Sequence, residues 1–348
     1  MNTLTDKSID LFDYQNNFER YKAISSKLIC GNQNSRTVPS ITICVPVYKP
    51  NIVFFKKTLQ SLKVQDCSCD YEILIVNNEN VDRNRDLVYQ TIIESNIKNF
   101  LYYVNDDNIG MIGNWNRCIE LARSNLITFC HADDELKSDC LSRLLKLHSE
   151  FPNYMISSAF DVIDENDNFI VKYKYNCGGR FFCKHSINRL DLFDLFHGGI
   201  GFGVGCLFEK EKLIKIGGFC PDYYPSADYA LFIKYCYQYG LIQNEIPTFN
   251  YRKAVNDSFN QWKNFLVMDS FFRKCMSSKI RLPNCFLSFY STALYKFQRE
   301  SFAKSWTKEG DSVTVEKCDF LSWLFVKIVL KISHLKKYKF RLRVKNEK

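Results

Sequence analysis

Apolar stretches recur between Ile41 and Glu135, and segments with helical spacing separate them. Four stretches predict buried strands: ITICVPVY (41–48), YEILIVNN (71–78), FLYYVNDD (100–107) and LITFCHADD (126–134). The intervening segments, 52–64, the stretch up to about 95, and 110–125, favour helices. Strands that alternate with helices of roughly 10–15 residues are typical of βαβ units. The pattern therefore predicts an α/β fold with a mostly parallel central sheet flanked by helices.

Polar residues stand at the end of each predicted strand. They are Tyr48, Asn77, Asn78, Asp106, Asp107, Asp133 and Asp134. In open α/β sheets, ligands bind outside the carboxyl ends of the strands. We therefore expect one edge of the sheet to gather most of the polar candidates for a functional site.

Beyond residue 138 the pattern becomes mixed. It predicts a helix capped by Ser138, an antiparallel hairpin around the ENDN turn (165–168), a helix over 227–240 and a strand over 241–252. The glycine-rich stretch 198–205 does not stand between a strand and a helix, so it is not a dinucleotide fingerprint. From about residue 259 the chain is expected to be helical to its end.

These patterns suggest three regions and no internal repeat. Residues 1–38 are expected to form a helical lead-in with a polar linker. Residues 39–258 are expected to form the main domain, with two halves at 39–135 and 136–258. Residues 259–348 form a C-terminal helical region with a basic amphipathic tail.

Composition places the chain among globular proteins, since 46% of its residues are apolar and 15% are aromatic. We expect neither a signal peptide nor a transmembrane span, because the first residues are polar and no long apolar run follows. The 15 cysteines are scattered, and a single tight pair, Cys67 and Cys69, cannot build a four-ligand zinc site. Five others are expected to be small buried residues in a reducing cytosol: Cys44, Cys118, Cys130, Cys206 and Cys236.

The net charge of +9 is concentrated at the C-terminus. Residues 327–348 hold nine Lys or Arg and one acid, Glu347, a net of +8, which leaves +1 for the rest of the chain. A nearly neutral body argues against nucleic-acid binding.

The clearest candidate for chemistry is HADDE (131–135), with two adjacent carboxylates, Asp133 and Asp134, at the end of a buried strand. Such a pair is costly to bury unless a positive group lies beside it, and a divalent cation on a diphosphate meets that need. The other interpretation is an acidic first turn for the following helix. The residues alone leave both interpretations open.

Five segments in order resemble the family 2 glycosyltransferases of the GT-A fold. They are TICVPVY, EILIVNN, NIGMIGNWNRCIELA, ITFCHADDELK, and GGF followed by SADYALFIKY, and the resemblance covers about residues 40–255. It implies a GT-A fold, with a nucleotide-sugar-binding half at 39–135 and an acceptor half at 136–258, and an inverting transfer of a sugar from a nucleotide-diphosphate donor. It also implies Mn²⁺ or Mg²⁺ as cofactor.

The resemblance implies two groups of acids. Asp133 matches the last acid of the family's DxD-like motif, which holds the metal and the donor diphosphate, and Asp134 follows it as a second metal ligand. His131 stands where the first acid is expected. Asp228 matches the catalytic base, although Ala227 replaces the usual glutamate before it. A carboxylate is needed there because an acceptor hydroxyl is a poor nucleophile until it loses its proton. The alternative is that Asp228 only caps its helix.

The resemblance also implies a nucleotide-sugar site. Its residues besides Asp133 are Pro46, Val47, Tyr48, Asn77, Asn78, Asn108, Gly110, Asn116, Arg117 and Arg252. Asn77 and Asn78 stand where the family often has an aspartate that reads the base. Because an amide both donates and accepts, uridine and thymidine remain possible. Arg117 is expected either to neutralise phosphate or to be a solvated helix residue, and Arg252 to face the donor phosphates or the acceptor.

The C-terminal tail is predicted to be an amphipathic helix. Lys327 and Lys331 lie four residues apart on a basic face, and Trp323 and Phe325 lie on the apolar face. This pattern fits a helix lying on an anionic membrane surface through residues 320–348, and the alternative is an ordinary packing helix. The first interpretation places the protein in the cytoplasm, peripherally at the inner face of the cell membrane.

Two functions follow as hypotheses. The first is a hexosyltransferase that acts on a glycan or lipid-linked acceptor in surface polysaccharide synthesis, with a UDP-sugar favoured and a dTDP-sugar possible. The second is a catalytically inactive GT-A domain that serves as a membrane-docked scaffold. His131, Asn77 and Ala227 replace residues that the family usually has, and they favour the second.

Overall fold

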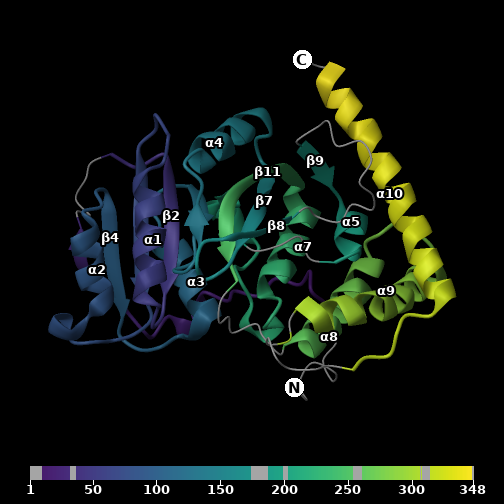
Figure 1. The fold of residues 1–348 in the computed structure, drawn as a ribbon, viewed down its shortest axis with the longest axis horizontal. Helices are drawn as coiled ribbons and strands as arrows, with labels where there is room; N and C mark the ends of the chain where they lie inside the picture. The colour runs from purple at the N-terminus through teal and green to yellow at the C-terminus, as the bar shows by residue number, and fades with distance from the viewer. Residues whose placement is uncertain are drawn as a thin grey trace.

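The computed structural model describes residues 10–31, 37–173, 187–198, 203–253, 261–305, 307 and 314–346. A six-stranded sheet lies at one end of the molecule, a second sheet lies in the middle, and helices α8, α9 and α10 gather at the other end (Figure 1). The glycine-rich stretch expected at 198–205 lies partly outside the described residues.

The six-stranded sheet has the order β1 (Ser26–Gly31), β4 (Phe100–Asn105), β3 (Tyr71–Asn77), β2 (Ile41–Val47), β5 (Leu126–Phe129) and β10 (Phe208–Glu209). The four inner strands pair in parallel, and the two edge strands pair antiparallel. Their crossovers carry α1 (Ile52–Lys63), α2 (Leu87–Ser95) and α3 (Gly110–Leu121). This arrangement confirms the predicted α/β fold with a mostly parallel sheet.

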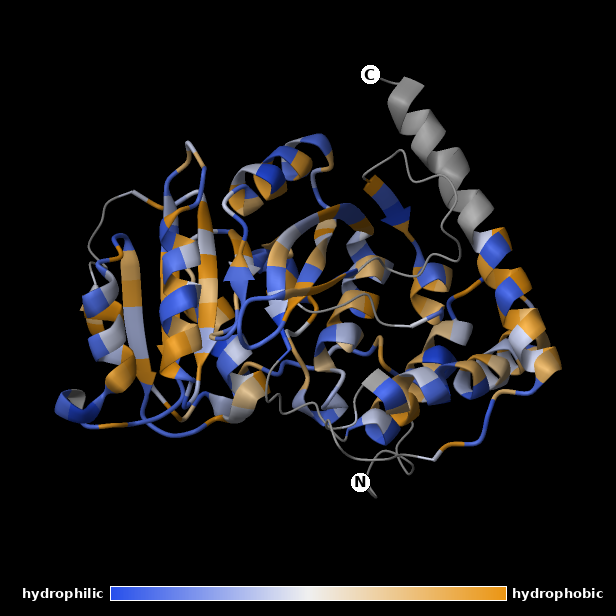
Figure 2. Ribbon diagram, in the orientation of Figure 1, coloured by the Kyte–Doolittle hydropathy of each residue, from blue (hydrophilic) through white to orange (hydrophobic). Residues whose placement is uncertain are grey.

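The inner strands are buried on both faces, which explains their nearly continuous apolar sequences. In β2 every residue except Pro46 is buried. Figure 2 shows hydrophobic residues along the strands of this sheet. Burial on both sides holds the strands in register and brings their carboxyl ends to one edge.

The second sheet has the order β6 (Glu135–Leu136), β11 (Leu241–Arg252), β7 (Met155–Ile163) and β8 (Phe169–Tyr173), and β9 (Ile187–Leu190) also pairs with β11. Strands β7 and β8 form the predicted antiparallel hairpin. Strand β11 pairs with β6 directly after the HADDE segment, so the second sheet begins at the candidate acids. The helices of this half are α4 (Cys140–Glu150), α5 (Leu192–Phe196), α6 (Lys210–Lys215) and α7 (Ala227–Tyr239).

Two local predictions were wrong. Helix α4 follows Asp139 rather than Ser138, and Asp139 forms an ion pair with Arg143 instead of capping the helix through its side chain. The N-terminal segment Asp10–Gly31 is not a helix, because it contains a 3₁₀ turn (Glu19–Tyr21) and then β1. The segment forms a strand because β1 pairs with β4. Without β1, β4 would be an edge strand with unpaired backbone N–H and C=O groups, and the sequence of β1 does not reveal that partner.

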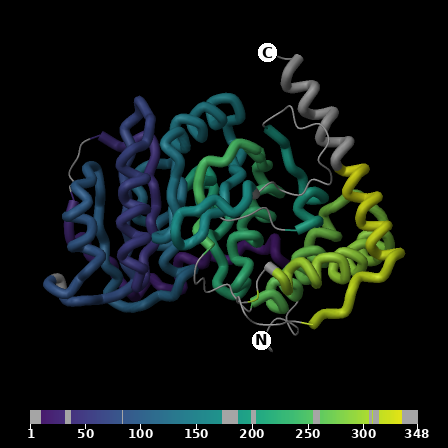
Figure 3. Tube along the Cα trace, viewed as in Figure 1, coloured from purple at the N-terminus to yellow at the C-terminus, as the bar shows by residue number. Residues whose placement is uncertain are grey.

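The N-terminal segment Asp10–Gly31 links the two halves of the main domain. Its start lies against the turn before α7, where Asn17 donates from its backbone and its side chain to the carbonyl of Gly217 at 3.1 and 2.9 Å. Arg20 pairs with Asp222 at 2.6 Å, and the segment then reaches the edge of the six-stranded sheet as β1 (Figure 3). The segment therefore connects the loop between α6 and α7 to the six-stranded sheet.

The C-terminal region is helical as predicted, with α8 (Trp262–Ser277), α9 (Asn284–Ser305) and α10 (Phe320–Asn346). Helix α10 packs on α9 and β9, and it buries Val326 and Val329. Across the described part of the chain, no helix is both long and apolar enough to cross a membrane.

The five cysteines that were predicted to be small buried residues are buried in the structure. Cys44, Cys118, Cys130, Cys206 and Cys236 are buried thiols outside any disulfide. Cys67 and Cys69, in the loop between α1 and β3, are joined as a disulfide. The loop lies at the amino end of β3, on the opposite side of the sheet from the strand-end acids.

Candidate active site

The acid turn, His131–Glu135, lies between β5 and β6. Within it the Asp134 side chain points into the protein and is 1% exposed. Its Oδ1 accepts a hydrogen bond from the backbone N–H of Arg252 at 2.9 Å. Its Oδ2 has no hydrogen-bond partner and lies 3.5 Å from Nδ1 of His131. One carboxylate oxygen of this buried residue is thus left for a positive group.

Asp133 is only partly buried, so its carboxyl remains within reach of solvent. Burial and, after it, the neighbouring Asp134 together raise the pKa of Asp133 to about 6, while His131 opposes the rise. Two carboxyls in such a place repel each other and favour a cation between or beside them.

His131 joins the acids to an aromatic wall. Its ring stacks on Trp115 with centroids 5.6 Å apart, and Trp115 in turn meets the edge of Phe219 at 5.1 Å. Burial lowers the pKa of His131, but Asp134, Asp133 and Asp228 outweigh it, so the pKa lies above its usual value. His131 therefore lies within electrostatic reach of both groups of acids.

Asp228 is the second residue of α7, and its carboxylate Oδ1 accepts the N–H of Tyr229 at 2.8 Å. The N-cap position is Ser226, so Asp228 does not cap the helix in the usual way. Burial raises the pKa of Asp228 to about 6, although the Tyr229 N–H and His131 lower it. A half-buried carboxyl with this pKa can take up a proton near neutral pH.

The fold thus brings together residues that the sequence separates widely. Asp133 and His131 come from the end of β5, and Asp228 comes from the start of α7. His131 carries electrostatic interactions with Asp133 and Asp228 alike. The arrangement offers a carboxylate base beside an acid turn that favours a cation.

The two aspartate carboxylates of the acid turn fit a divalent cation that is held partly by the protein and partly by the phosphate groups of a bound nucleotide. Asp134 Oδ2 is a buried carboxylate oxygen without a hydrogen bond, and Asp133 is desolvated next to it. Carboxylate oxygens suit Mg²⁺ and Mn²⁺. The described residues contain no group of three or more His, Cys, Asp or Glu that could hold a metal. The remaining ligands would then come from phosphate oxygens and water.

A cluster of asparagines holds the ends of β3 and β4 together. Asn78 donates to Asn108 Oδ1 and the Gly110 carbonyl at 2.7 and 3.2 Å. Its own Oδ1 accepts from Asn105 and from the Ile109 N–H at 2.9 and 3.0 Å. The predicted role of the Asn78 amide in reading a base is therefore wrong for this structure, because the amide is saturated by protein groups.

Asn77 is likewise engaged inside the protein. Its side chain donates to Tyr102 Oη at 3.0 Å and accepts the N–H of Glu79 at 3.1 Å. Tyr48 is 50% exposed at the end of β2, and Gly110 has open space where a Cβ would stand. Pro46, Val47 and Asn108 lie at the same edge of the sheet. This edge stays the predicted nucleotide site, with Tyr48 as its exposed side chain.

Asn116 and Arg117 have structural partners rather than free polar groups. Asn116 exchanges two hydrogen bonds of 2.8 Å with the backbone of Phe219. Arg117 is buried, and its guanidinium donates to Ser26 Oγ and to the carbonyls of Tyr21 and Ile24. Both expectations for Arg117, phosphate binding and solvation, are therefore wrong, because the N-terminal segment Asp10–Gly31 covers it.

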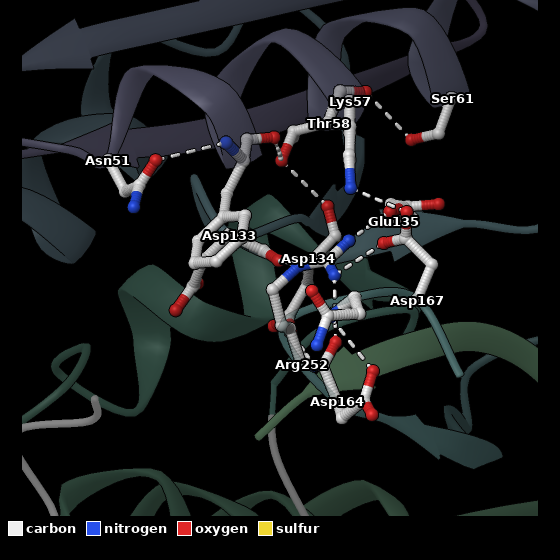
Figure 4. A network of polar contacts seen from close by, with 12 residues as sticks. Asn51, Lys57, Thr58, Ser61, Asp133, Asp134, Glu135, Asp164, Asp167 and Arg252 are labelled. Carbon is white, nitrogen blue, oxygen red and sulfur yellow. Dashed lines mark hydrogen bonds and ion pairs between the residues drawn. The ribbon is translucent and has the colours of Figure 1, made fainter. Parts of the chain in front are cut away.

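Arg252 is also fully buried, and Figure 4 shows its guanidinium among the carboxyl and carbonyl groups of the acid turn and the β7–β8 hairpin. Arg252 was predicted to face the donor phosphates or the acceptor. The structure does not support this contact, because every guanidinium nitrogen already has a protein partner. Its partners came from a hairpin distant in sequence, which no local pattern could reveal.

Sequence reasoning did not single out Trp115, Asn105 or Asn114. Trp115 supports His131, and Asn105 and Asn114 bond to each other at 3.0 Å beneath Asn78. The stretch GMIGNWN could have pointed to Asn114 and Trp115, because these polar and aromatic residues directly follow the glycines at the start of a predicted helix. Residues 199–202 of the glycine-rich stretch, and residues 254–260, lie outside the part of the chain that the structure describes.

Comparison with known proteins agrees with this architecture. The sequence profile described as "Glycosyl transferase family 2" matches residues 42–217. An uncharacterized protein of Mycobacterium tuberculosis is 26% identical over 200 residues, 55% of this chain and 60% of that protein. The match thus spans less than two thirds of the length of that curated relative.

Among solved structures, residues 1–349 of Staphylococcus aureus TarS in complex with UDP-GlcNAc superpose with a TM-score of 0.57 at 13% identity. That match covers 82% of this chain and 79% of the TarS chain. The same TarS fragment in another crystal structure gives a TM-score of 0.55 at 13% identity, over 82% and 78% of the two chains. The likeness to TarS shows a common fold, and the profile covers half of the sequence with the acid turn inside it. The chain belongs to glycosyl transferase family 2 and has the GT-A fold.

Proposed function

We propose that this protein is an inverting, metal-dependent hexosyltransferase that uses a nucleotide-diphosphate sugar. The observation that carries the proposal is that the acid turn and the start of α7 lie on one side-chain cluster. His131 stacks on Trp115, Trp115 packs on Phe219 in the loop before α7, and Asp228 raises the pKa of His131. A base for an acceptor hydroxyl and a cation site for a leaving diphosphate are the two groups that a direct displacement needs.

In the proposed reaction Asp228 accepts the proton of the acceptor hydroxyl as the oxygen attacks the anomeric carbon. The bond between that carbon and the diphosphate oxygen breaks from the opposite side, so the configuration inverts without a covalent intermediate. Asp133 and Asp134 would hold Mn²⁺ or Mg²⁺, which when bound neutralises the charge of the departing diphosphate. Burial keeps Asp228 poised, because its pKa of about 6 makes it an effective base at neutral pH.

The donor is proposed to lie along the carboxyl ends of β2 and β3. Tyr48 is the exposed side chain there, and Gly110 leaves room for close approach of a ligand. The TarS structures contain UDP or UDP-GlcNAc, which supports a UDP-sugar as the first donor to test. A dTDP-sugar remains the second, and surface polysaccharide synthesis is the proposed setting.

The direct test is release of nucleoside diphosphate from a panel of nucleotide sugars with Mn²⁺ and glycan acceptors. Asp228→Asn should reduce turnover at least 10³-fold, on the order of the loss of a general base. Asp222→Asn is the matched control, because Asp222 lies on the same segment but pairs with Arg20. Full activity of the Asp228 variant would show that another group is the base.

A catalytically inactive scaffold is the second candidate, and one observation favours it. His131 occupies the place of an acid, and its Nδ1 lies 3.5 Å from the orphaned oxygen of Asp134. A protonated His131 could satisfy that oxygen without any metal. If the wild type neither releases diphosphate nor binds Mn²⁺ with any donor or acceptor, the scaffold interpretation holds.

We also propose that α10 rests on an anionic membrane surface. Its inner face packs on α9, and four apolar residues point outward, Leu321, Leu324, Ile328 and Ile332, with exposures of 74%, 38%, 49% and 62%. Lys327 and Lys331 are exposed beside them, and Figure 2 shows this mixture of hydrophobic and hydrophilic turns. The predicted apolar face was partly wrong, because Phe325 packs inward against Phe289 at 5.0 Å.

Flotation with vesicles tests this surface. The wild type should bind vesicles that contain phosphatidylglycerol and leave pure phosphatidylcholine vesicles unbound, because the tail carries a net charge of +8. A Leu324→Glu/Ile328→Glu variant should lose binding, while Val64→Glu, at an exposed apolar site directly after α1, should keep it. Binding of the protein to a membrane surface would bring it close to a lipid-linked acceptor. Equal binding to neutral vesicles, or concentration-dependent dimers without vesicle binding, would overturn the proposal.

A further inference from the structure

The strongest unassigned group outside the proposed chemistry is the buried guanidinium of Arg252, at the end of β11. Its side chain is 0% exposed, and the ring of Phe54 lies 4.7 Å from the guanidinium carbon. A buried cation is costly unless acceptors surround it. Each of its nitrogens is therefore expected to serve a defined partner.

Those partners are concentrated on the acid turn. The Arg252 backbone N–H donates to Asp134 Oδ1 at 2.9 Å, and its Nε donates to the Asp133 carbonyl at 3.0 Å. Its Nη2 pairs with the Glu135 carboxylate. One residue thus holds three consecutive residues of the turn through backbone and side chain together (Figure 4).

The far side of the guanidinium is anchored to the β7–β8 hairpin. Its Nη1 donates to the Asp164 carbonyl at 3.0 Å and pairs with Asp167 Oδ1 at 2.6 Å. Asp167 also binds Lys57 of α1 at 2.5 Å, and Thr58 of the same helix donates to the Asp134 carbonyl at 2.8 Å. The acid turn is therefore tied to a hairpin and to a helix at once.

We propose that Arg252 is a positioning residue that holds the acid turn, with Asp133 and Asp134, in the shape that a divalent cation needs. The proposal rests on the proposed function, since it assumes that the turn binds a metal. It assigns Arg252 to the support of the metal ligands and not to the donor phosphates. Residues that orient metal ligands typically change metal affinity by about 10–100-fold when they are replaced.

The test is a titration of Mn²⁺ against the protein in the presence of UDP, followed by the electron paramagnetic resonance signal of free Mn²⁺, with a titration of UDP alone subtracted. Arg252→Lys keeps one charge but lacks the planar fork, and it should weaken Mn²⁺ binding about 10–100-fold. Asp167→Asn releases the outer anchor at a side chain that is 46% exposed, and it should weaken binding about threefold, less than that range, because Arg252 keeps its contacts with the acid turn.

Arg123→Met is the matched control. Arg123 also pairs with a buried carboxylate, Glu72, but it follows α3 near the amino end of β5, away from the acid turn. Its variant should bind Mn²⁺ like the wild type. Saturating Mn²⁺ should restore the turnover of Arg252→Lys, because the substitution changes affinity rather than the reacting groups.

The outcomes separate the proposals. Wild-type affinity in both the Arg252 and Asp167 variants would overturn the positioning role while leaving the metal site intact. An equal loss in Arg123→Met would show a general effect of stability and would overturn it too. If Arg252→Lys does not fold, Asp167→Asn decides. A wild type that binds no Mn²⁺ would overturn the proposed metal site, and the positioning role with it.

Discussion

A single carboxyl, Asp228, sets the pH range in which the proposed reaction runs. Burial raises its pKa to about 6, so it is a carboxylate above pH 6 and is progressively protonated below it. A protonated base cannot accept the acceptor proton. We expect kcat/KM, measured with saturating Mn²⁺ to keep Asp133 ionised, to fall about tenfold per pH unit below 6. A profile that stays flat between pH 5 and pH 7 would contradict this.

The same carboxyl should destabilise the fold at neutral pH. A raised pKa means that the folded state favours the neutral form. Stability is therefore lost as the pH rises from the ordinary value of 3.8 to about 6, and the full cost remains above pH 6. Asp228→Asn removes that cost and should raise the free energy of unfolding at pH 7.5 by about 1 kcal/mol. The gain should vanish at pH 4, and urea unfolding at the two pH values measures it.

Asn78 should act on stability rather than on the choice of base. Its amide makes four hydrogen bonds to Asn108, Gly110, Asn105 and Ile109. Asn78→Ala leaves these groups unpaired in the interior and should lower the free energy of unfolding by about 3 kcal/mol. Its ratio of UDP-sugar to dTDP-sugar turnover should stay that of the wild type. A changed ratio would restore a direct role in reading the base.

At the scale of elements, the N-terminal segment Asp10–Gly31 and the turn before α7 are fitted to each other. Gly217 has φ +88°, and a Cβ there would lie 1.9 Å from the Gln15 carbonyl. Gly217→Ala should therefore lower the free energy of unfolding by about 3 kcal/mol. Gly203→Ala is the control, since nothing lies within 4 Å of its Cβ position. Equal stability of the two variants would show that the contact is unimportant.

Helix α3 explains why this fit matters for the site. Its Asn114 binds the carbonyl of Val76 at the end of β3, and its Asn116 holds the backbone of Phe219 before α7. Its Trp115 stacks on His131. Three consecutive residues therefore set the relative positions of the nucleotide edge, the acid turn and the helix of Asp228. A movement of α3 would change all three together.

At the scale of the molecule, α10 places charge and apolar surface on the same side. The Debye length shrinks as salt rises, so the attraction of the basic tail to anionic lipid should weaken. We expect vesicle binding to fall at least tenfold between 0.05 and 0.5 M NaCl in flotation assays, with a remainder from the outward apolar residues. Salt-independent binding would show that the basic residues contribute little.

The order of strands and helices was predictable because buried parallel strands are nearly continuous in apolar residues and helices have their own spacing. The family motifs could be recognised for the same reason, since they stand at strand ends that a parallel sheet brings to one edge. The start of α4 was missed because Asp139 takes the N-cap position and pairs with Arg143. The N-terminal strand was missed because its pairing partner, β4, is distant in the sequence.

The sequence by itself determined the fold class, the family and which acids stand at strand ends. Only the tertiary structure decided what each polar side chain meets. Arg117 and Arg252 have the residue type of phosphate ligands, yet the N-terminal segment Asp10–Gly31 buries one and the β7–β8 hairpin buries the other. The physical reason is that burying a guanidinium requires acceptors from several segments, and their meeting depends on the packing of the whole chain.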